Sequence, residues 1–193
     1  MNNCKQMLMG GGRSILNQLF LDLKPWCKQS NCKMLIRVFL IHPTFRAIVI
    51  NRLYNRYKFK PFKLLCKIYN SHLRTKYHIE IPLSVKIGNS PMFPHEGSVV
   101  INFRCEIGDN VTIFPGVLIG SKPGGCPKIG NNVVIGSGAK IIGGITIEDN
   151  IFIAPNSVVV KNQKENTTIG GIPSHIINNN GIKSCKTYAY NRY

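Results

Sequence analysis

The chain is poor in acidic residues and has no long apolar run, and each shortage narrows what it can be. Only 8 of its 193 residues are Asp or Glu, against 25 Lys or Arg, so the formal net charge is +17. Its longest apolar stretch, residues 34–41, is broken by Arg37 and is too short to cross a bilayer. The N-terminus lacks the pattern of a signal peptide. Any membrane contact is therefore expected to be peripheral.

Cysteine and histidine are present but scattered. The seven cysteines are odd in number, and no pair has the spacing of metal ligands. Residues 96–174 contain no histidine, which argues against a metal centre built on imidazoles in that segment. We therefore expect no metal site, and a reduced, cytoplasmic chain fits this cysteine usage best.

The positive charge is concentrated near the N-terminus. Residues 1–79 carry 15 basic side chains and one acidic one, a net of +14 (15 − 1), whereas residues 80–175 carry seven of each. Such a basic head is typical of contact with an anionic membrane surface, a polyanionic ligand or nucleic acid, or of a solvated helical face. Nucleic acid is the least favoured, since no aromatic–basic module is present, and none is expected as a partner. Peripheral contact with the inner face of a membrane through residues 1–78 stays open.

What the sequence has in abundance is an aliphatic repeat with a period of six residues. Isoleucine recurs at 101, 107, 113 and 119, and again at 129, 135, 141, 147 and 153. A second ladder runs two residues ahead of it, at 99, 105, 111 and 117 and then from 133 to 157. A period of six fits neither a helix nor a simple strand, and it is typical of a solenoid in which each unit forms one short strand and one corner.

The segment before the repeat has helical spacing. Residues 33–57 carry an apolar stripe of helical period, Pro43 suits the first turn of a new helix, and Pro61 suits the start of another. Residues 1–32 are poorly patterned, so we expect the start of the chain to be mobile.

These patterns divide the chain into three parts. We expect a basic helical region over residues 1–78, a repeat domain over 79–177, and a flexible tail over 178–193. The predicted fold class is mainly β with an N-terminal α-helical region.

The repeat slips out of phase twice. Ile87 and Ile101 lie 14 residues apart, two more than two units, and Ile119 and Ile129 lie 10 apart, four more than one unit. Insertions in a solenoid go to loops, often on its functional face. We therefore look for the site in the two surplus segments, residues 89–97, which contain His95, and residues 120–127, which contain Cys126.

Several motifs together resemble the hexapeptide-repeat acyltransferases, in particular their serine acetyltransferase-like branch. The residues that carry the resemblance are Ile87-Gly88, His95-Glu96-Gly97, Ile107-Gly108-Asp109-Asn110-Val111, Gly116-Val117-Leu118-Ile119-Gly120, Pro127-Lys128-Ile129-Gly130, Ile135-Gly136-Ser137-Gly138 and Gly171-Ile172-Pro173-Ser174. The resemblance covers about residues 80–177. It implies a left-handed parallel β-helix of triangular section with three units to a coil. It also implies a homotrimer or a dimer of trimers, with active sites between neighbouring prisms.

The resemblance implies acetyl transfer from acetyl-CoA to a hydroxyl, with His95 as the catalytic residue. A neutral hydroxyl needs a base, and a histidine titrating near neutrality is the usual one. The family orients its histidine with an acid, and Glu80 stands at the matching position, with Glu96 as a competing candidate. The family's second histidine corresponds to Cys126, which is thereby a candidate substrate contact together with Glu96.

The same resemblance implies that coenzyme A binds in a groove between neighbouring prisms, where backbone groups of the later coils hold most of it. Its positions in this chain are Gly120, Ser121, Lys122, Ser137, Gly138 and Pro155. The small residues among them allow close approach of the cofactor, and a lysine can meet its phosphates.

Three departures from the family pattern weaken serine as the acceptor and favour a sugar-like or otherwise different hydroxyl. The basic residue that would meet the carboxylate of serine is Gly125, the second histidine is Cys126, and the acid before the catalytic histidine is Pro94. The leading hypothesis is an acetyl-CoA-dependent O-acetyltransferase of the serine O-acetyltransferase type, whose small-molecule acceptor is L-serine or a sugar. The alternatives are O-acetylation of a cell-envelope or capsular sugar, and a non-catalytic β-helix scaffold.

Overall fold

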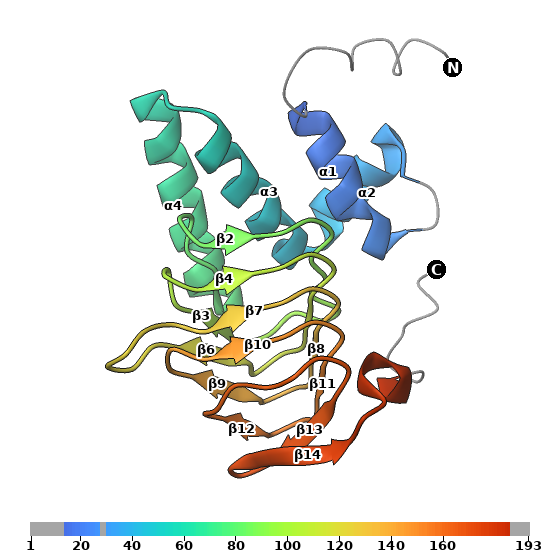
Figure 1. The fold of residues 1–193 in the computed structure, drawn as a ribbon. Helices are drawn as coiled ribbons and strands as arrows, with labels where there is room; N and C mark the ends of the chain where they lie inside the picture. The colour runs from blue at the N-terminus through green and yellow to red at the C-terminus, as the bar shows by residue number, and fades with distance from the viewer. Residues whose placement is uncertain (1–13, 28–29, 186–193) are drawn as a thin grey trace.

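The protein consists of a helical head on one end of a triangular β-prism (Figure 1). The structure is a computed structural model, and it describes residues 14–27 and 30–185. The expectation of a mobile start over residues 1–13, and the end of the expected tail, 186–193, lie outside this described part.

The described residues of the head form four α-helices and one 3-10 turn. They are α1 (Ile15–Leu23), the 3-10 turn η2 (Lys24–Trp26), α2 (Cys32–Ile41), α3 (Pro43–Arg56) and α4 (Lys60–Tyr77). The predicted helix starts at Pro43 and near Pro61 are confirmed, because both prolines occupy the first turn of a helix. Helix α1 was not expected in the poorly patterned stretch 1–32. It forms because Leu19 and Leu23 are buried against the other helices of the head.

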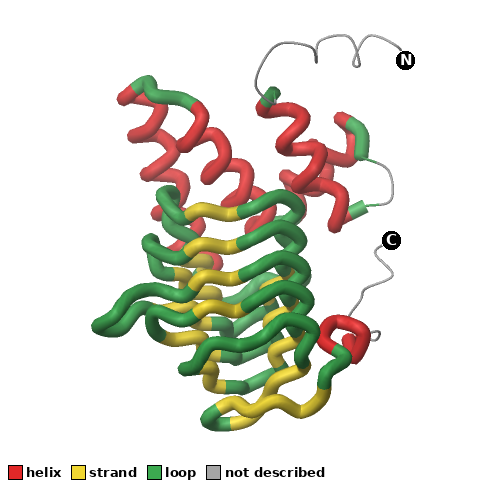
Figure 2. Tube along the Cα trace, viewed as in Figure 1, coloured by secondary structure: helices red, strands yellow, loops and turns green. Residues whose placement is uncertain are grey.

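The repeats form three parallel sheets, one on each face of the prism (Figures 1 and 2). Face A contains β1 (Ile79–Glu80), β3 (Val99–Ile101), β6 (Leu118–Gly120), β9 (Lys140–Ile142) and β12 (Val158–Val159). Face B contains β2 (Lys86–Ile87), β4 (Glu106–Ile107), β7 (Lys128–Ile129) and β10 (Thr146–Ile147). Face C contains β5 (Thr112–Ile113), β8 (Val134–Ile135), β11 (Phe152–Ile153), β13 (Thr168–Gly171) and β14 (Ser174–Asn178). The predicted parallel β-helix with a helical head is confirmed.

The isoleucine ladders fill the prism. Ile119 pairs in register with Ile101 and Ile141 on face A, and both ladders are buried in one continuous core. Equivalent side chains of consecutive coils therefore stack on one another inside the prism. The apolar area that they remove from water is the main stabilising term of the repeat.

A ladder of asparagines turns the chain at the corner between faces B and C. Asn110, Asn132, Asn150 and Asn166 have positive φ angles of 57°, 54°, 59° and 60°. Asparagine tolerates this left-handed conformation better than most residues. Each side-chain amide donates to the next one down, at 3.1–3.2 Å. The repeated Asn residues of the sequence are thus explained by corner geometry.

The last coil ends in a hairpin. Strand β14 pairs antiparallel with β13, so it cannot template a further parallel coil. A 3-10 turn, η3 (Gly181–Cys185), follows, and the Ile182 amide donates to the Asn150 carbonyl at 3.2 Å. The chain to residue 185 is thus held against the prism.

A buried ion pair fastens the head to the first coil. The Arg52 guanidinium on α3 donates to both carboxylate oxygens of Asp22 on α1, at 2.9 and 3.2 Å, and the Asp22 side chain is fully buried. Arg52 also donates to the carbonyls of Ile87 and Gly88, while Asp22 accepts from the Ser90 amide at 3.0 Å. Two helices and the start of loop 89–97 therefore share one charge pair.

Removing one partner of this pair is expected to be costly. Asp22→Ala leaves Arg52 nearly buried without its counter-charge, and we expect a loss of about 3–5 kcal/mol in the free energy of unfolding, measured by urea titration. The matched control is Glu106→Ala, which removes the exposed pair with Lys86 and is expected to cost less than about 1 kcal/mol. Equal losses in the two variants would contradict the role given to the buried pair.

Candidate active site

His95 lies in the first of the two insertions, at the corner between faces C and A. Met92 pairs with Thr112, so Phe93 is level with Ile113, and Val100 pairs with Leu118. The two surplus residues of this coil therefore lie within 94–98, which includes His95. The imidazole is exposed and lies 6.3 Å from the ring of Phe114, centroid to centroid.

The head provides one wall of the surroundings of His95. A cavity of about 390 Å³ lies between α2 and the loop. It is lined by Pro25, Trp26, Cys27, Met34, Arg37, Val38, Ile41, His42, Met92, Pro94 and His95. Most of these side chains are apolar, so one side of the imidazole faces a mainly apolar surface.

A second histidine and a carboxylate belong to the same region. Partial burial lowers the pKa of His42 from its ordinary value, and the negative charge of Glu96 opposes this shift. The His42 ring also lies 4.8 Å from Trp26, centroid to centroid. Glu96, expected as a candidate acid for His95, is thus close enough to His42 to act on its charge.

Three of the expected cofactor positions lie below His95 on the same corner. The coils stack there through backbone hydrogen bonds, from the Gly138 amide to the Pro115 carbonyl at 2.9 Å and from the Asn156 amide to the Ser137 carbonyl at 2.8 Å. Gly138 has a φ of 74°, and a side chain at this position would collide with Asn156. Ser137, Gly138 and Pro155 therefore form a narrow, closely packed column that continues from the His95 loop.

The other expected positions lie at the opposite edge of face A. Gly120, Ser121, Lys122 and Cys126 belong to the second insertion, where the Lys122 and Gly125 backbones exchange two hydrogen bonds. This turn is the predicted loop, and it projects beyond the strands in Figure 2. The structure thus separates the expected cofactor residues into two sets on two corners.

Asn102 connects the residues at this second corner. Its amide donates to the Ser121 hydroxyl at 3.1 Å, and its carbonyl oxygen accepts from the Cys126 thiol at 3.3 Å. Arg104 follows two residues later, with its guanidinium 5.2 Å from the Phe103 ring. The sequence analysis did not identify Asn102 and Arg104 as candidate site residues. The signal that could have identified them is their position at the corner from which the second insertion extends.

Cys126 has a second thiol beside it. Burial, followed by the charge and hydrogen bond of Cys126, raises the pKa of Cys105 to about 12. Cys105 therefore stays protonated near neutral pH and is a poor nucleophile. Cys126 is the more accessible of the two.

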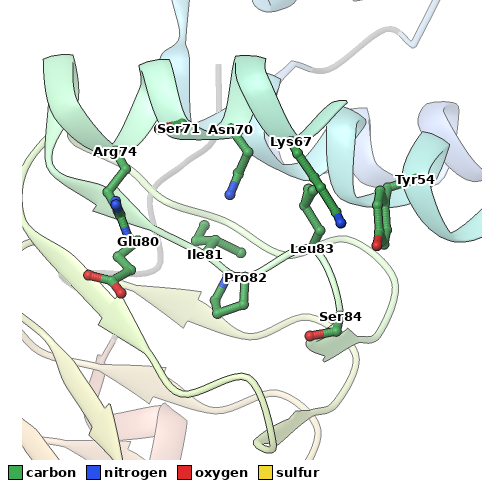
Figure 3. A pocket seen from close by; sticks show the side chains of 10 residues that line it. All are labelled: Tyr54, Lys67, Asn70, Ser71, Arg74, Glu80, Ile81, Pro82, Leu83 and Ser84. Carbon is green, nitrogen blue, oxygen red and sulfur yellow. The ribbon is translucent and has the colours of Figure 1, made fainter. Parts of the chain in front are cut away.

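Glu80 lies on face A and not beside His95. It lines a cavity under α4 with Tyr54, Lys67, Arg74 and others (Figure 3), and a second cavity of about 430 Å³ with Asn102 and Ser121. His95 lines neither of these. About five residues of extended chain separate the two corners of face A, roughly 16 Å. Within one chain, the structure brings Glu80 together with the second corner.

Among the residues that the structure describes, no group of three or more His, Cys, Asp or Glu side chains could hold a metal ion. No single described helix is long and apolar enough to cross a membrane. Helices α2 and α3 pass that test only as a pair bent by 113°.

Comparisons with known proteins identify first the class of protein to which the chain belongs and then its family. The family model for the bacterial transferase hexapeptide matches residues 126–161. Serine acetyltransferase from Staphylococcus aureus is 38% identical over 152 residues, which cover 77% of this chain and 70% of that protein. The serine acetyltransferase of Staphylococcus epidermidis is 36% identical over the same length.

Solved structures agree with these relatives. Soybean serine acetyltransferase in complex with serine has a TM-score of 0.73 at 27% identity, covering 85% of this chain and 70% of that chain. The Brucella abortus serine acetyltransferase in complex with coenzyme A has a TM-score of 0.71 at 27% identity, covering 83% and 66%. The chain belongs to the serine acetyltransferase family of hexapeptide-repeat acyltransferases.

The lowered pKa of His42 has a consequence for stability. A histidine whose folded pKa lies below its unfolded value of 6.5 is neutral in both states at higher pH. It takes up its proton first in the unfolded state as the pH falls. We therefore expect wild type to lose stability relative to His42→Gln below about pH 6.5, measured as free energy of unfolding between pH 8 and pH 5.

The substitution also removes the contact with Trp26, but that loss is the same at every pH. His72→Gln, the same change on the exposed side of α4, is the matched control. A constant difference between wild type and His42→Gln across the range would contradict the prediction.

Proposed function

We propose that this chain is an acetyl-CoA-dependent O-acetyltransferase that acetylates the hydroxyl of L-serine, with His95 as its general base. The observation that carries the proposal is the position of His95. It lies in an insertion at the corner between faces C and A, next to the closely packed residues of that corner. The chain is 38% identical to a serine acetyltransferase. Relatives described as complexes with serine and with coenzyme A support both substrates.

The proposed reaction needs no covalent enzyme intermediate. The imidazole of His95 removes the proton of the acceptor hydroxyl as its oxygen attacks the thioester carbonyl carbon. The tetrahedral intermediate that forms carries its negative charge on the former carbonyl oxygen, which backbone N–H groups can stabilise. The carbon–sulfur bond then breaks, and the departing thiolate takes the proton from His95. The products are the acetyl ester and free coenzyme A.

We place the complete site between two copies of the chain. The two half-sites lie at opposite corners of face A, one with His95, Ser137 and Pro155 and the other with Cys126 and Glu80. Two corners of one prism cannot close on the same substrate, but a corner of one copy can meet the opposite corner of a neighbour. This argument supports a closed ring of copies, a homotrimer or a dimer of trimers. Glu80 would then act on the imidazole of an adjacent copy.

Acetyl-CoA fits the corner that carries the small residues. Ser137 and Gly138 present backbone there with little side chain, which suits close contact with an extended pantetheine arm. Lys122 from the second insertion supplies a point charge for a phosphate. We assign Ser137, Gly138 and Pro155 to one wall of the donor site, and Gly120, Ser121 and Lys122 of a neighbouring copy to its other wall.

The cation for the acceptor's carboxylate is proposed to be Arg104. Gly125 removes the family's basic residue from this corner, but Arg104 lies beside Asn102, and Asn102 in turn contacts Cys126. A guanidinium is well suited to bind a carboxylate with two hydrogen bonds. A sugar acceptor would not need this cation, so the same residue separates the two candidate acceptors.

The chemical role of His95 is directly testable. We expect His95→Ala to lower kcat for acetyl transfer from acetyl-CoA to L-serine by roughly 10²–10⁴-fold, because the hydroxyl loses its base. Coenzyme A release, followed with a thiol reagent in the presence and absence of serine, measures it. His72→Ala, on the exposed side of α4, should retain wild-type activity. Activity of His95→Ala within a few-fold of wild type would overturn the assignment.

The role of Arg104 predicts a different kinetic change. Arg104→Gln should raise KM for L-serine about tenfold or more with little change in kcat, since the carboxylate contact is present equally in the ground and transition states. Arg56→Gln, an exposed arginine at the end of α3, is the matched control. If Arg104→Gln leaves KM for L-serine unchanged while an aminosugar proves the better substrate, the sugar alternative replaces L-serine.

Cysteine usage supports a cytoplasmic location, which we propose for this enzyme. The seven cysteines are odd in number and scattered along the chain, and no pair has the spacing of metal ligands. This usage fits a reduced chain, since disulfides are rare in the cytosol.

A further inference from the structure

Helix α4 exposes a stripe of large apolar side chains to solvent. Phe59, Leu64, Leu65 and Ile68, called here the α4 stripe, are 69%, 58%, 63% and 59% exposed. Leu64 and Ile68 lie one turn apart, so they project from the same side of the helix. The opposite side of α4 is packed, with Cys66 and Leu73 buried. Within residues 14–27 and 30–185, the stripe is therefore an outer apolar surface that neither the rest of the head nor the prism covers.

The stripe borders an apolar groove between α3 and α4. The groove has a volume of about 550 Å³ and is lined by Ile50, Leu53, Phe62, Leu65, Cys66, Ile68, Tyr69 and His72. Stripe and groove together form a continuous apolar surface, because Leu65 and Ile68 belong to both. Exposed apolar surface of this kind, rimmed by polar residues, is typical of an interaction site.

The rim of the stripe is cationic and contains no acid. Lys60 lies one turn before Leu64, Lys67 lies one turn after it, and Arg74 follows two turns further along the helix. Helices α3 and α4 contain no Asp or Glu, and Asp22, buried and paired with Arg52, is the one acidic residue among residues 14–79. In the described part of the chain, no hydrogen bond or ion pair occupies the side chains of Lys60 and Lys67. The exposed side of α4 is thus apolar in the middle and positive at its edge.

We propose that the α4 stripe docks on a membrane surface that contains anionic lipid, with the helix lying in the interface. A bilayer interface offers an apolar layer and, a few ångströms above it, a layer of negative headgroups. The stripe and its lysines match these two layers in order. A second copy of this chain would bring a surface of the same sign within a Debye length of about 8 Å. The charge therefore favours anionic lipid over the α4 stripe of a second copy as the occupant of this surface.

The mode of binding follows from the length of the apolar surface. The stripe runs from the N-cap residue Phe59 to Ile68, about two and a half helical turns, and no described helix is a single membrane span. Binding would therefore be reversible and salt-dependent, and it would leave the prism in water. This docking is independent of the proposed acetyl transfer, since the stripe includes none of the residues assigned to catalysis.

The test uses the full chain and sedimentation with vesicles of phosphatidylcholine alone or with 30% phosphatidylglycerol. We expect binding to the anionic vesicles that weakens between 50 and 500 mM NaCl, and little binding to the neutral ones. Each lysine near an anionic surface contributes about fivefold, so Lys60→Glu/Lys67→Glu should weaken binding at least tenfold. The matched control, Lys164→Glu/Lys183→Glu, makes the same charge change at the far end of the prism and should bind nearly as wild type.

A second pair of substitutions tests the apolar part. Leu64→Gln/Ile68→Gln changes only exposed side chains, so the fold is retained, and binding should fall at least tenfold while acetyl transfer to L-serine is unchanged. Absence of vesicle binding in wild type would overturn the proposal, as would equal loss in the two charge variants. A change in oligomeric mass of Leu64→Gln/Ile68→Gln in light scattering, without vesicles, would assign the stripe to a contact between copies instead.

Discussion

The buried pair between Asp22 and Arg52 is the interaction on which the site depends. A single carboxylate accepts from Arg52 and from the Ser90 amide, while Arg52 also donates to the carbonyls that end β2. The Ser90 hydroxyl adds a hydrogen bond to the Leu21 carbonyl at 2.8 Å. Hydrogen bonds from the head therefore fix the start of loop 89–97, and the Thr44 hydroxyl donates to the Phe93 carbonyl further along the loop. The head is a platform for the histidine loop as well as a cap on the prism.

The prism itself could be predicted from the sequence because its pattern is local. Each isoleucine of the ladder occupies the same position in its unit, so a period of six determines the strands, the corners and the stacking together. The two slips in that period identified the loops with His95 and Cys126 for the same reason. Pro43 and Pro61 gave two helix starts, since proline is favoured in the first turn.

The parts that could not be predicted depend on contacts distant in sequence. Asp22 interrupts the apolar pattern of a nine-residue helix, and only its partner 30 residues later explains it. The expected cofactor residues Ser121 and Ser137 lie on different corners, which the sequence alone did not reveal. Periodicity gives the place of a residue within a coil, whereas the distance between corners follows from the closed triangular section. The corner of Asn102 and Arg104, which we propose binds the acceptor, was missed for this reason, because its residues meet others across coils.

The central claim is that the head holds the histidine loop through Asp22, and hydrogen exchange tests it most directly. Asp22→Asn keeps the size of the side chain and removes the charge. The account predicts faster amide exchange in residues 89–97, together with a lower kcat for acetyl transfer to L-serine, and unchanged exchange in β7, β8 and β11 of the prism. Wild-type exchange in residues 89–97 of Asp22→Asn would contradict it.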